Sequence, residues 1–168
     1  GNTSLKHALF KRARLIGTAE NKLEKLEDLI RSRDQIEHTL VYCGDGSVED
    51  DMTGQTKRHV DATVELLSNE LHLSVNRFTA RESQAEREVL LDEFESGDLQ
   101  ALVAIRCLDE GIDVPATKTA YVLASSSNPR QFVQRRGRIL RQHHNKDHAV
   151  IHDFVVAPPS MSGGTMSD

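Results

Sequence analysis

The sequence has only two cysteines and no long apolar run. Cys43 and Cys107 form no CxxC pair and each adjoins an apolar segment, which predicts buried small hydrophobic residues in a reducing compartment instead of a disulfide or a zinc site. No apolar run approaches the roughly 18 residues that a membrane span needs, and no basic and then apolar leader opens the chain. We therefore expect a soluble cytoplasmic protein without a membrane partner.

The chain also lacks an excess of positive charge, since its formal net charge is −5 over 168 residues. Binding of nucleic acid through bulk electrostatics alone usually requires a strongly basic domain, so this class of protein is disfavoured. The charge is uneven, however, because residues 130–146 carry five arginines and one lysine and no acidic residue. A local basic segment on an acidic body suits a specific anion better than a long polyanion.

The spacing of apolar residues predicts the order of elements in one main domain. Short apolar segments bounded by turn residues predict buried strands at residues 39–43, 73–78, 101–105, 120–124 and 149–156. Helical spacing predicts helices at residues 5–30, 55–71, 82–94 and 129–142. This alternation predicts a three-layer α/β domain with a mainly parallel sheet. The expected organisation is a lead-in helical segment (1–34), this domain (35–156) and a disordered tail (157–168).

In two of these helices, apolar residues at helical spacing form a stripe along one side, which we expect to face the core. The stripes are Val60, Val64, Leu67 and Leu71 in the first of them, and Ala85, Val89, Leu90 and Phe94 in the second. Gly97 is placed to end the second helix, since glycine readily takes the left-handed conformation at a helix C-terminus.

Two segments beyond the carboxyl ends of predicted strands could carry chemistry, because ligands of open parallel sheets bind there. The first is AIRCLDEGIDVP, residues 104–115, in which Gly111 permits close backbone approach and Asp113 offers a carboxylate. Alone, a glycine followed by an acid is more often a turn.

The second segment is QFVQRRGRILR, residues 131–141. At about 100° per residue, one side of this helix carries Gln134, Gly137, Arg138 and Arg141. Guanidinium groups that converge past a glycine form a pocket for an anion such as a phosphate. The alternative is a solvated basic face paired with acidic helices. Arg136 falls on the apolar side with Val133, Ile139 and Leu140, so either the helix is irregular there or a buried acid holds Arg136.

These segments resemble the second RecA-like domain of superfamily 2 helicases, over residues 39–156 and in the family's order. AIRCLDEGIDVP resembles motif V, QRRGRILR resembles motif VI (Q-R-x-G-R-x-x-R), and TLVYC before Gly44 resembles motif IV. The segment 77–104 resembles the stretch between them, and residues 11–30 are similar to the bridging helix that leads into this domain.

The resemblance implies roles for individual residues. Arg138 and Arg141 would be arginine fingers on the γ-phosphate of ATP, with Gln134 and Gly137 beside them, and Gly111 and Asp113 would face the ribose. Nucleic-acid contacts in the family come from loops that here contain Gly44, Asp45, Thr79, Ala80, Ile105 and Arg106.

The sequence departs from the family's pattern at two positions of motif V. Ile105 stands where many members have a phosphate-binding threonine, and Glu110 stands where the DEAD-box RNA helicases have arginine. The glutamine that opens motif VI favours DNA-directed relatives similar to excision-repair and type III restriction helicases.

The chain contains no GxxxxGK[ST] phosphate loop and no DExH or DExD segment. The resemblance therefore implies half of an active site, in which ATP lies between this lobe and an N-terminal RecA-like lobe that holds Mg²⁺. This fragment alone is expected to be inactive.

Two other functions compete with this one. A catalytically inert lobe could bind protein or nucleic acid, but three converging phosphate-binding groups then have no physical purpose. A metal enzyme is suggested by His143, His144, His148 and His152, but their spacing matches no ligand pattern, so surface and strand positions are favoured and no metal ligand is assigned.

Overall fold

The computed structural model describes residues 21–49, 56–105, 113–124, 129–144 and 146–155. The five longer strands form one parallel sheet in the order β4-β5-β1-β6-β7. They are β1 (Thr39–Cys43), β4 (Val75–Phe78), β5 (Ala101–Ile105), β6 (Thr119–Val122) and β7 (Val150–Asp153). The five predicted strands and the parallel sheet are confirmed, with shifts of a few residues at the strand ends.

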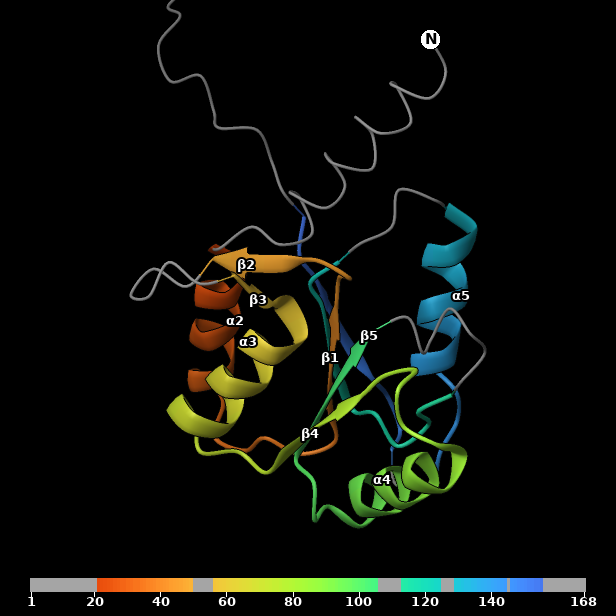
Figure 1. The fold of residues 1–168 in the computed structure, drawn as a ribbon. Helices are drawn as coiled ribbons and strands as arrows, with labels where there is room; N and C mark the ends of the chain where they lie inside the picture. The colour runs from red at the N-terminus through yellow and green to blue at the C-terminus, as the bar shows by residue number, and fades with distance from the viewer. Residues whose placement is uncertain (1–20, 50–55, 106–112, 125–128, 145, 156–168) are drawn as a thin grey trace, which may run out of the picture.

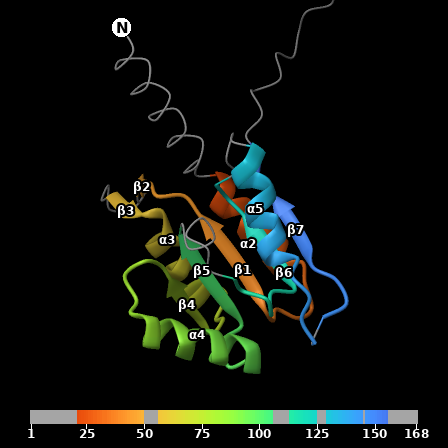
Figure 2. The same ribbon diagram turned by 90° about the vertical axis from the view of Figure 1, so that its right-hand side faces the viewer.

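Helices cover both faces of this sheet (Figures 1 and 2). One face carries α2 (Asn21–Arg31), α3 (His59–Glu65) and the π-helical turn η1 (Leu66–Glu70), and the other carries α4 (Gln84–Ser96) and α5 (Pro129–Ile139). Side chains of β1 alternate between the two cores, because Val41 packs with the α2 and α3 side and Leu40 packs with the α4 and α5 side. The predicted three-layer α/β architecture is therefore confirmed.

A short antiparallel hairpin corrects the prediction for residues 44–58. The predicted loop contains β2 (Ser47–Glu49), and the helix predicted from residue 55 begins at His59, after β3 (Thr56–Arg58). Strands of three largely polar residues show no hydrophobic periodicity, so the sequence pattern could not reveal them. The expected stripe of α3 and η1 does face the core, since Val60 and Leu67 are buried and Val64 and Leu71 pack against them.

Helix α4, predicted over residues 82–94, runs from Gln84 to Ser96 and ends at Gly97 as predicted, but fewer of its predicted core-facing residues are buried. Leu90 and Phe94, one turn apart, are buried, whereas Ala85 is exposed and Val89 is 55% exposed. Val89 lies about 100° around the helix from Leu90, which turns its side chain away from the sheet. Ser83 and Glu86 form a capping box at the start, and Gly97 ends the helix with φ of 89°.

Replacing Gly97 by alanine is expected to lower the free energy of unfolding by about 1 kcal/mol, because an L-residue with a Cβ is strained at positive φ. Gly97→Asn is the matched control and should cost less, since asparagine tolerates this conformation. Urea denaturation of both variants measures the difference. Equal stability of the glycine and alanine chains would contradict the assigned cap.

The remaining predictions concern the ends of the chain and the cysteines. Within the predicted helix 5–30, α2 is helical from residue 21 and buries Leu26 and Ile30. Cys43 is buried as expected, whereas Cys107, residues 1–20 and the predicted tail lie outside the described residues. Within the described part of the chain, no helix is both long and apolar enough to cross a membrane.

Candidate functional site

The carboxyl ends of three adjacent strands bring the predicted loop residues to one edge of the sheet. Cys43 at the end of β1 is paired in register with Ile105 at the end of β5, and Phe78 at the end of β4 is paired with Ala104. Gly44, Thr79 and Ile105 therefore lie at the same edge of the sheet. Arg106 lies outside the described residues.

The side chains at this edge differ in what they can offer to a ligand. Thr79 is buried, and both its backbone N–H and its hydroxyl donate to the carboxylate of Glu82, at 2.6 and 2.9 Å. Ile105 is buried, Ala80 is exposed, and Asp45 forms an ion pair with Arg58 at 3.8 Å. A phosphate could reach the Thr79 hydroxyl only if Glu82 moved, which the sequence did not indicate.

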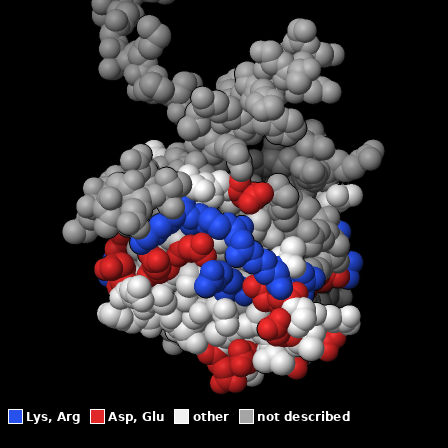
Figure 3. All heavy atoms as spheres, viewed as in Figure 1, with Lys and Arg blue, Asp and Glu red and all other residues white. Residues whose placement is uncertain are grey.

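Lys and Arg side chains form a band across one face of the molecule, with Asp and Glu beside it (Figure 3). Three cations line one pocket beside α3, and each is paired with an acid. The pairs are Lys57 with Glu65 at 2.8 Å, Arg58 with Asp45 at 3.8 Å and Arg77 with Asp61 at 2.7 Å. This pairing reduces the local positive charge, so binding of a polyanion by bulk charge remains disfavoured.

The motif on α5 and the segment before Pro115 meet through one ion pair. Arg141, just beyond the end of α5, places Nη1 2.6 Å from Oδ2 of Asp113. The Arg141 side chain is 61% exposed and that of Asp113 is 29% exposed. The structure therefore joins two residues that the sequence assigned to separate motifs, while Gly111 lies outside the described residues.

Arg138 lies on α5 with its guanidinium partly buried. Its Nη1 is buried and has no hydrogen-bond partner among the described residues, and the same holds for Oδ1 of Asp113. Buried polar atoms normally have a partner, because leaving one unsatisfied costs about 1–3 kcal/mol. A donor on α5 and an acceptor on Asp113, which Arg141 contacts, are thus without a partner among the described residues.

Gln134 and Gly137 are exposed on the same helix. A Cβ built on Gly137 would meet no atom within 4 Å among those of the structure. Glycine inside a helix costs roughly 0.5–1 kcal/mol relative to alanine, so the packing of this lobe does not explain its presence. The open space beside Gly137 suits the close approach of another molecule.

Arg136 forms an ion pair with an acid. Of the two explanations for its place on the apolar side, an irregular helix or an acidic partner, the structure favours the second. Nη2 of Arg136 donates to Oδ2 of Asp153 at 2.8 Å, and the Asp153 side chain is only 15% exposed. The prediction that Val133, Ile139 and Leu140 form one apolar side is wrong for two of them. Ile139 is buried, but Val133 and Leu140 are 66% and 52% exposed. This bond ties α5 to the end of β7. Asp153 lies inside the predicted strand 149–156, so the sequence pattern gave no signal that it would contact Arg136.

The four histidines that suggested a metal enzyme occupy three different surroundings. His152 stacks on Tyr121 with ring centroids 4.9 Å apart, and burial, followed by the charge of Arg33, lowers its pKa. His148 is exposed. His143 and His144 lie together beside Glu95, in an arrangement that the spacing of the histidines did not predict.

Comparison with protein families identifies the chain. The model of the helicase conserved C-terminal domain matches residues 21–143, which is most of the sequence. The chain belongs to this family. Its fold is that of the C-terminal lobe of superfamily 2 helicases: it matches the C-terminal domain of the DEAD-box protein Dbp5 with a TM-score of 0.60 and 19% identity, over 83% of this chain and 72% of that one.

Relatives of this helicase lobe act on different nucleic acids according to their names. The chain is 42% identical over 64 residues to the DNA 3'-5' translocase XPB2 of Sulfurisphaera tokodaii, and the matched segment covers 38% of this chain and 15% of the relative. It is 28% identical over 121 residues to the DEAD-box ATP-dependent RNA helicase 40 of Oryza sativa subsp. japonica, and this match covers 72% of this chain and 14% of the relative. The chain thus spans about 15% of the length of these relatives.

Proposed function

We propose that this chain is the C-terminal motor lobe of an ATP-dependent DNA helicase or translocase, and that Arg138 and Arg141 are its arginine fingers. The observation that carries the proposal is the contact between Arg141 and Asp113, which places a guanidinium of motif VI against motif V. Nη1 of Arg138, which has no hydrogen-bond partner in the described part of the chain, and the open space at Gly137 supply the fit for a phosphate.

The lobe contributes positioning and charge to the reaction. Transfer of the γ-phosphoryl group of ATP develops charge on its oxygens, which planar guanidinium groups stabilise in a bidentate manner. Arg136, bound to Asp153, ties α5, the helix that carries Arg138, to the end of β7. Closure of the N-terminal lobe, which holds Mg²⁺, would bring Arg138 and Arg141 to the phosphate, and Arg141 would then exchange Asp113 for that anion.

Nucleic acid would cross the edge at which β1, β4 and β5 end. Gly44, Asp45, Thr79, Ala80 and Ile105 lie at or beside this edge, and they are the proposed contacts with nucleic acid. Gln134 and the similarity to a DNA translocase favour DNA as the track.

Gly137→Ala is expected to separate stability from activity. The variant should raise the free energy of unfolding of this chain by about 0.5–1 kcal/mol, because alanine is the better helix former and its methyl group meets no atom here. In a parent chain with both lobes, the same methyl group should lower ATP turnover by obstructing the nucleotide or the partner lobe. Urea denaturation and steady-state ATP turnover measure the two effects, and unchanged turnover would contradict the proposed approach to Gly137.

Strand displacement tests the proposed activity. A parent chain with both lobes is given ATP and duplexes of DNA or RNA with a single-stranded tail at either end, and a DNA triplex in which a third strand reports translocation without unwinding. The proposal expects ATP-dependent displacement from the DNA substrates. A chain that binds these polymers but displaces no strand and turns over no ATP would be an inert binding lobe instead.

A further inference from the structure

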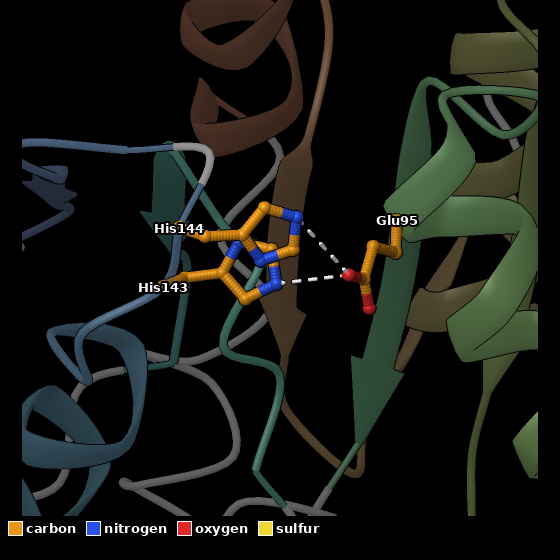
Figure 4. Close-up of side chains that lie close together, drawn as sticks. All are labelled: Glu95, His143 and His144. Carbon is orange, nitrogen blue, oxygen red and sulfur yellow. Dashed lines mark hydrogen bonds and ion pairs between the residues drawn. The ribbon is translucent and has the colours of Figure 1, made fainter.

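Three side chains from two distant segments converge on one point at the surface (Figure 4). Glu95 lies in the last turn of α4, and His143 and His144 follow α5. Both imidazole rings point toward the carboxylate of Glu95, with Oε1 3.2 Å from Nε2 of His143 and 3.8 Å from Nε2 of His144. The ring centroids of the two histidines are 4.3 Å apart.

We propose that Glu95, His143 and His144 form a binding site for a divalent transition metal, with Zn²⁺ as the preferred ion. Their ligand atoms all lie within 4.8 Å of one another. Ligands of tetrahedral zinc at about 2.0–2.1 Å lie roughly 3.3 Å apart, so small rotations of the Glu95 and His144 side chains would bring the ligand atoms to that spacing.

The donor set selects the class of ion. Two imidazole nitrogens and one carboxylate oxygen suit Zn²⁺, Co²⁺ or Ni²⁺, whereas Mg²⁺ and Ca²⁺ prefer sites made of oxygen atoms. Binding breaks the contacts of Nε2 with Glu95 and forms two metal–nitrogen bonds and one metal–oxygen bond. Each imidazole must present an unprotonated Nε2, so a hydrogen on that atom moves to Nδ1 or to solvent. Three protein ligands leave one position of the ion for water.

The site is accessible and partly preorganised. The side chains of His144 and Glu95 are 70% and 44% exposed, which gives the ion a path of entry, while that of His143 is only 9% exposed. The backbone N–H of Lys146 donates to the carbonyl of His143 at 3.1 Å. The Lys146 ammonium donates to the carbonyls of Ile139 and Thr117, at 2.7 and 2.9 Å, so it braces this turn against the end of α5. Ligands on a braced turn lose less entropy when they bind.

A bound ion would connect the C-terminal end of α4 to the segment that follows α5. That segment adjoins Arg141, so occupancy of the site would restrain Arg141 and the end of α5, the helix that carries Arg138. The metal site itself rests on the geometry at Glu95 and does not depend on the proposed function. Its test accordingly measures binding and not ATP turnover.

Titration of the chelator-treated 168-residue chain with Zn²⁺ in a calorimeter, and with Co²⁺ in a visible spectrometer, tests the site. One ion per chain is expected, with the absorption bands of four-coordinate cobalt and a rise in the melting temperature on addition of Zn²⁺. Glu95→Gln, His143→Ala and His144→Ala should each weaken binding by roughly 100-fold or more, because even indirect supports of metal ligands are worth 10–100-fold. His148→Ala, at an exposed histidine outside the cluster, should bind as the unmutated chain does.

Two results would overturn the proposal. The first is an unmutated chain that does not saturate at micromolar Zn²⁺, in which case the cluster is only a set of ion pairs. The second is equal affinity in the unmutated chain and the Glu95→Gln variant, which would place any bound ion elsewhere. Glu95→Gln preserves shape at a partly exposed position, so it decides the outcome even if His143→Ala fails to fold, and circular dichroism reports folding for each variant.

Discussion

Replacing Arg138 by alanine is expected to lower the ATP turnover of a parent chain with both lobes by on the order of 1,000-fold or more, at saturating ATP and nucleic acid. The loss should appear in kcat more than in KM, because a finger acts on charge that develops in the transition state. Steady-state and single-turnover kinetics measure the two parameters. Arg138→Lys should recover little of the activity, since an ammonium cannot form the bidentate contact.

Arg31→Ala is the matched control for Arg138→Ala. Arg31 lies on α2, is exposed and donates a hydrogen bond from its side chain to Glu27, one turn away, at 2.8 Å. Its loss should change turnover little and should cost less than about 1 kcal/mol of stability. If Arg138→Ala retained turnover within tenfold of the unmutated protein, Arg138 would not act on the transferred phosphoryl group. The basic face of α5 would then be an ordinary surface.

The stability of the chain is expected to fall by about 3 kcal/mol as the pH decreases from 6.5 to 4, through His59 alone. His59 is fully buried, and burial, followed by the charge of Lys22, lowers its pKa from 6.5 to about 4. Between pH 6.5 and pH 4 this histidine is therefore protonated in the unfolded chain and unprotonated in the folded chain. His59 therefore costs no stability well above pH 6.5, the loss grows as the pH falls from 6.5 to 4, and it increases no further well below pH 4.

His59→Leu should remove this dependence on pH. Both ring nitrogens of His59 lack a hydrogen-bond partner among the described residues. Replacing the ring by leucine therefore breaks no hydrogen bond and should be tolerated near pH 7. Urea denaturation of both chains at pH 7 and pH 4.5 isolates the contribution of His59, because the carboxyl groups titrate equally in the two. The exposed His148→Asn variant is the control. Equal losses of stability in the unmutated and His59→Leu chains would contradict the lowered pKa.

Most of the fold could be predicted from the sequence because short runs of apolar residues indicate buried strands. The segments TLVYC and ALVAI are buried on both faces, and such strands occur in parallel sheets that helices cover on both sides. The β2–β3 hairpin could not be predicted, since its stability comes from backbone pairing between short polar segments. The exposure of Val89 and Val133 was missed for a related reason: periodicity gives the spacing of a stripe but not the width of the surface that it meets.

Candidate site residues within one element could be proposed from the sequence, whereas contacts between distant elements were missed. Helical spacing placed Arg138 and Gly137 on one face, and the resemblance assigned their roles. The bonds of Arg136 to Asp153 and of Thr79 to Glu82 depend on how α5, β7 and the loop after β4 pack, which spacing does not encode. The convergence of His143 with Glu95, 48 residues earlier, is another example.

The dependence of ATP turnover on nucleic acid, in a parent chain with both lobes, tests the central claim most directly. Turnover is measured without polymer and with single- and double-stranded DNA and RNA at matched concentrations. We predict that DNA stimulates turnover strongly and that RNA does so weakly, because the lobe would couple closure over ATP to movement along DNA. Turnover that is absent, or that no polymer changes, would contradict a motor function and leave the chain as an inert member of its family.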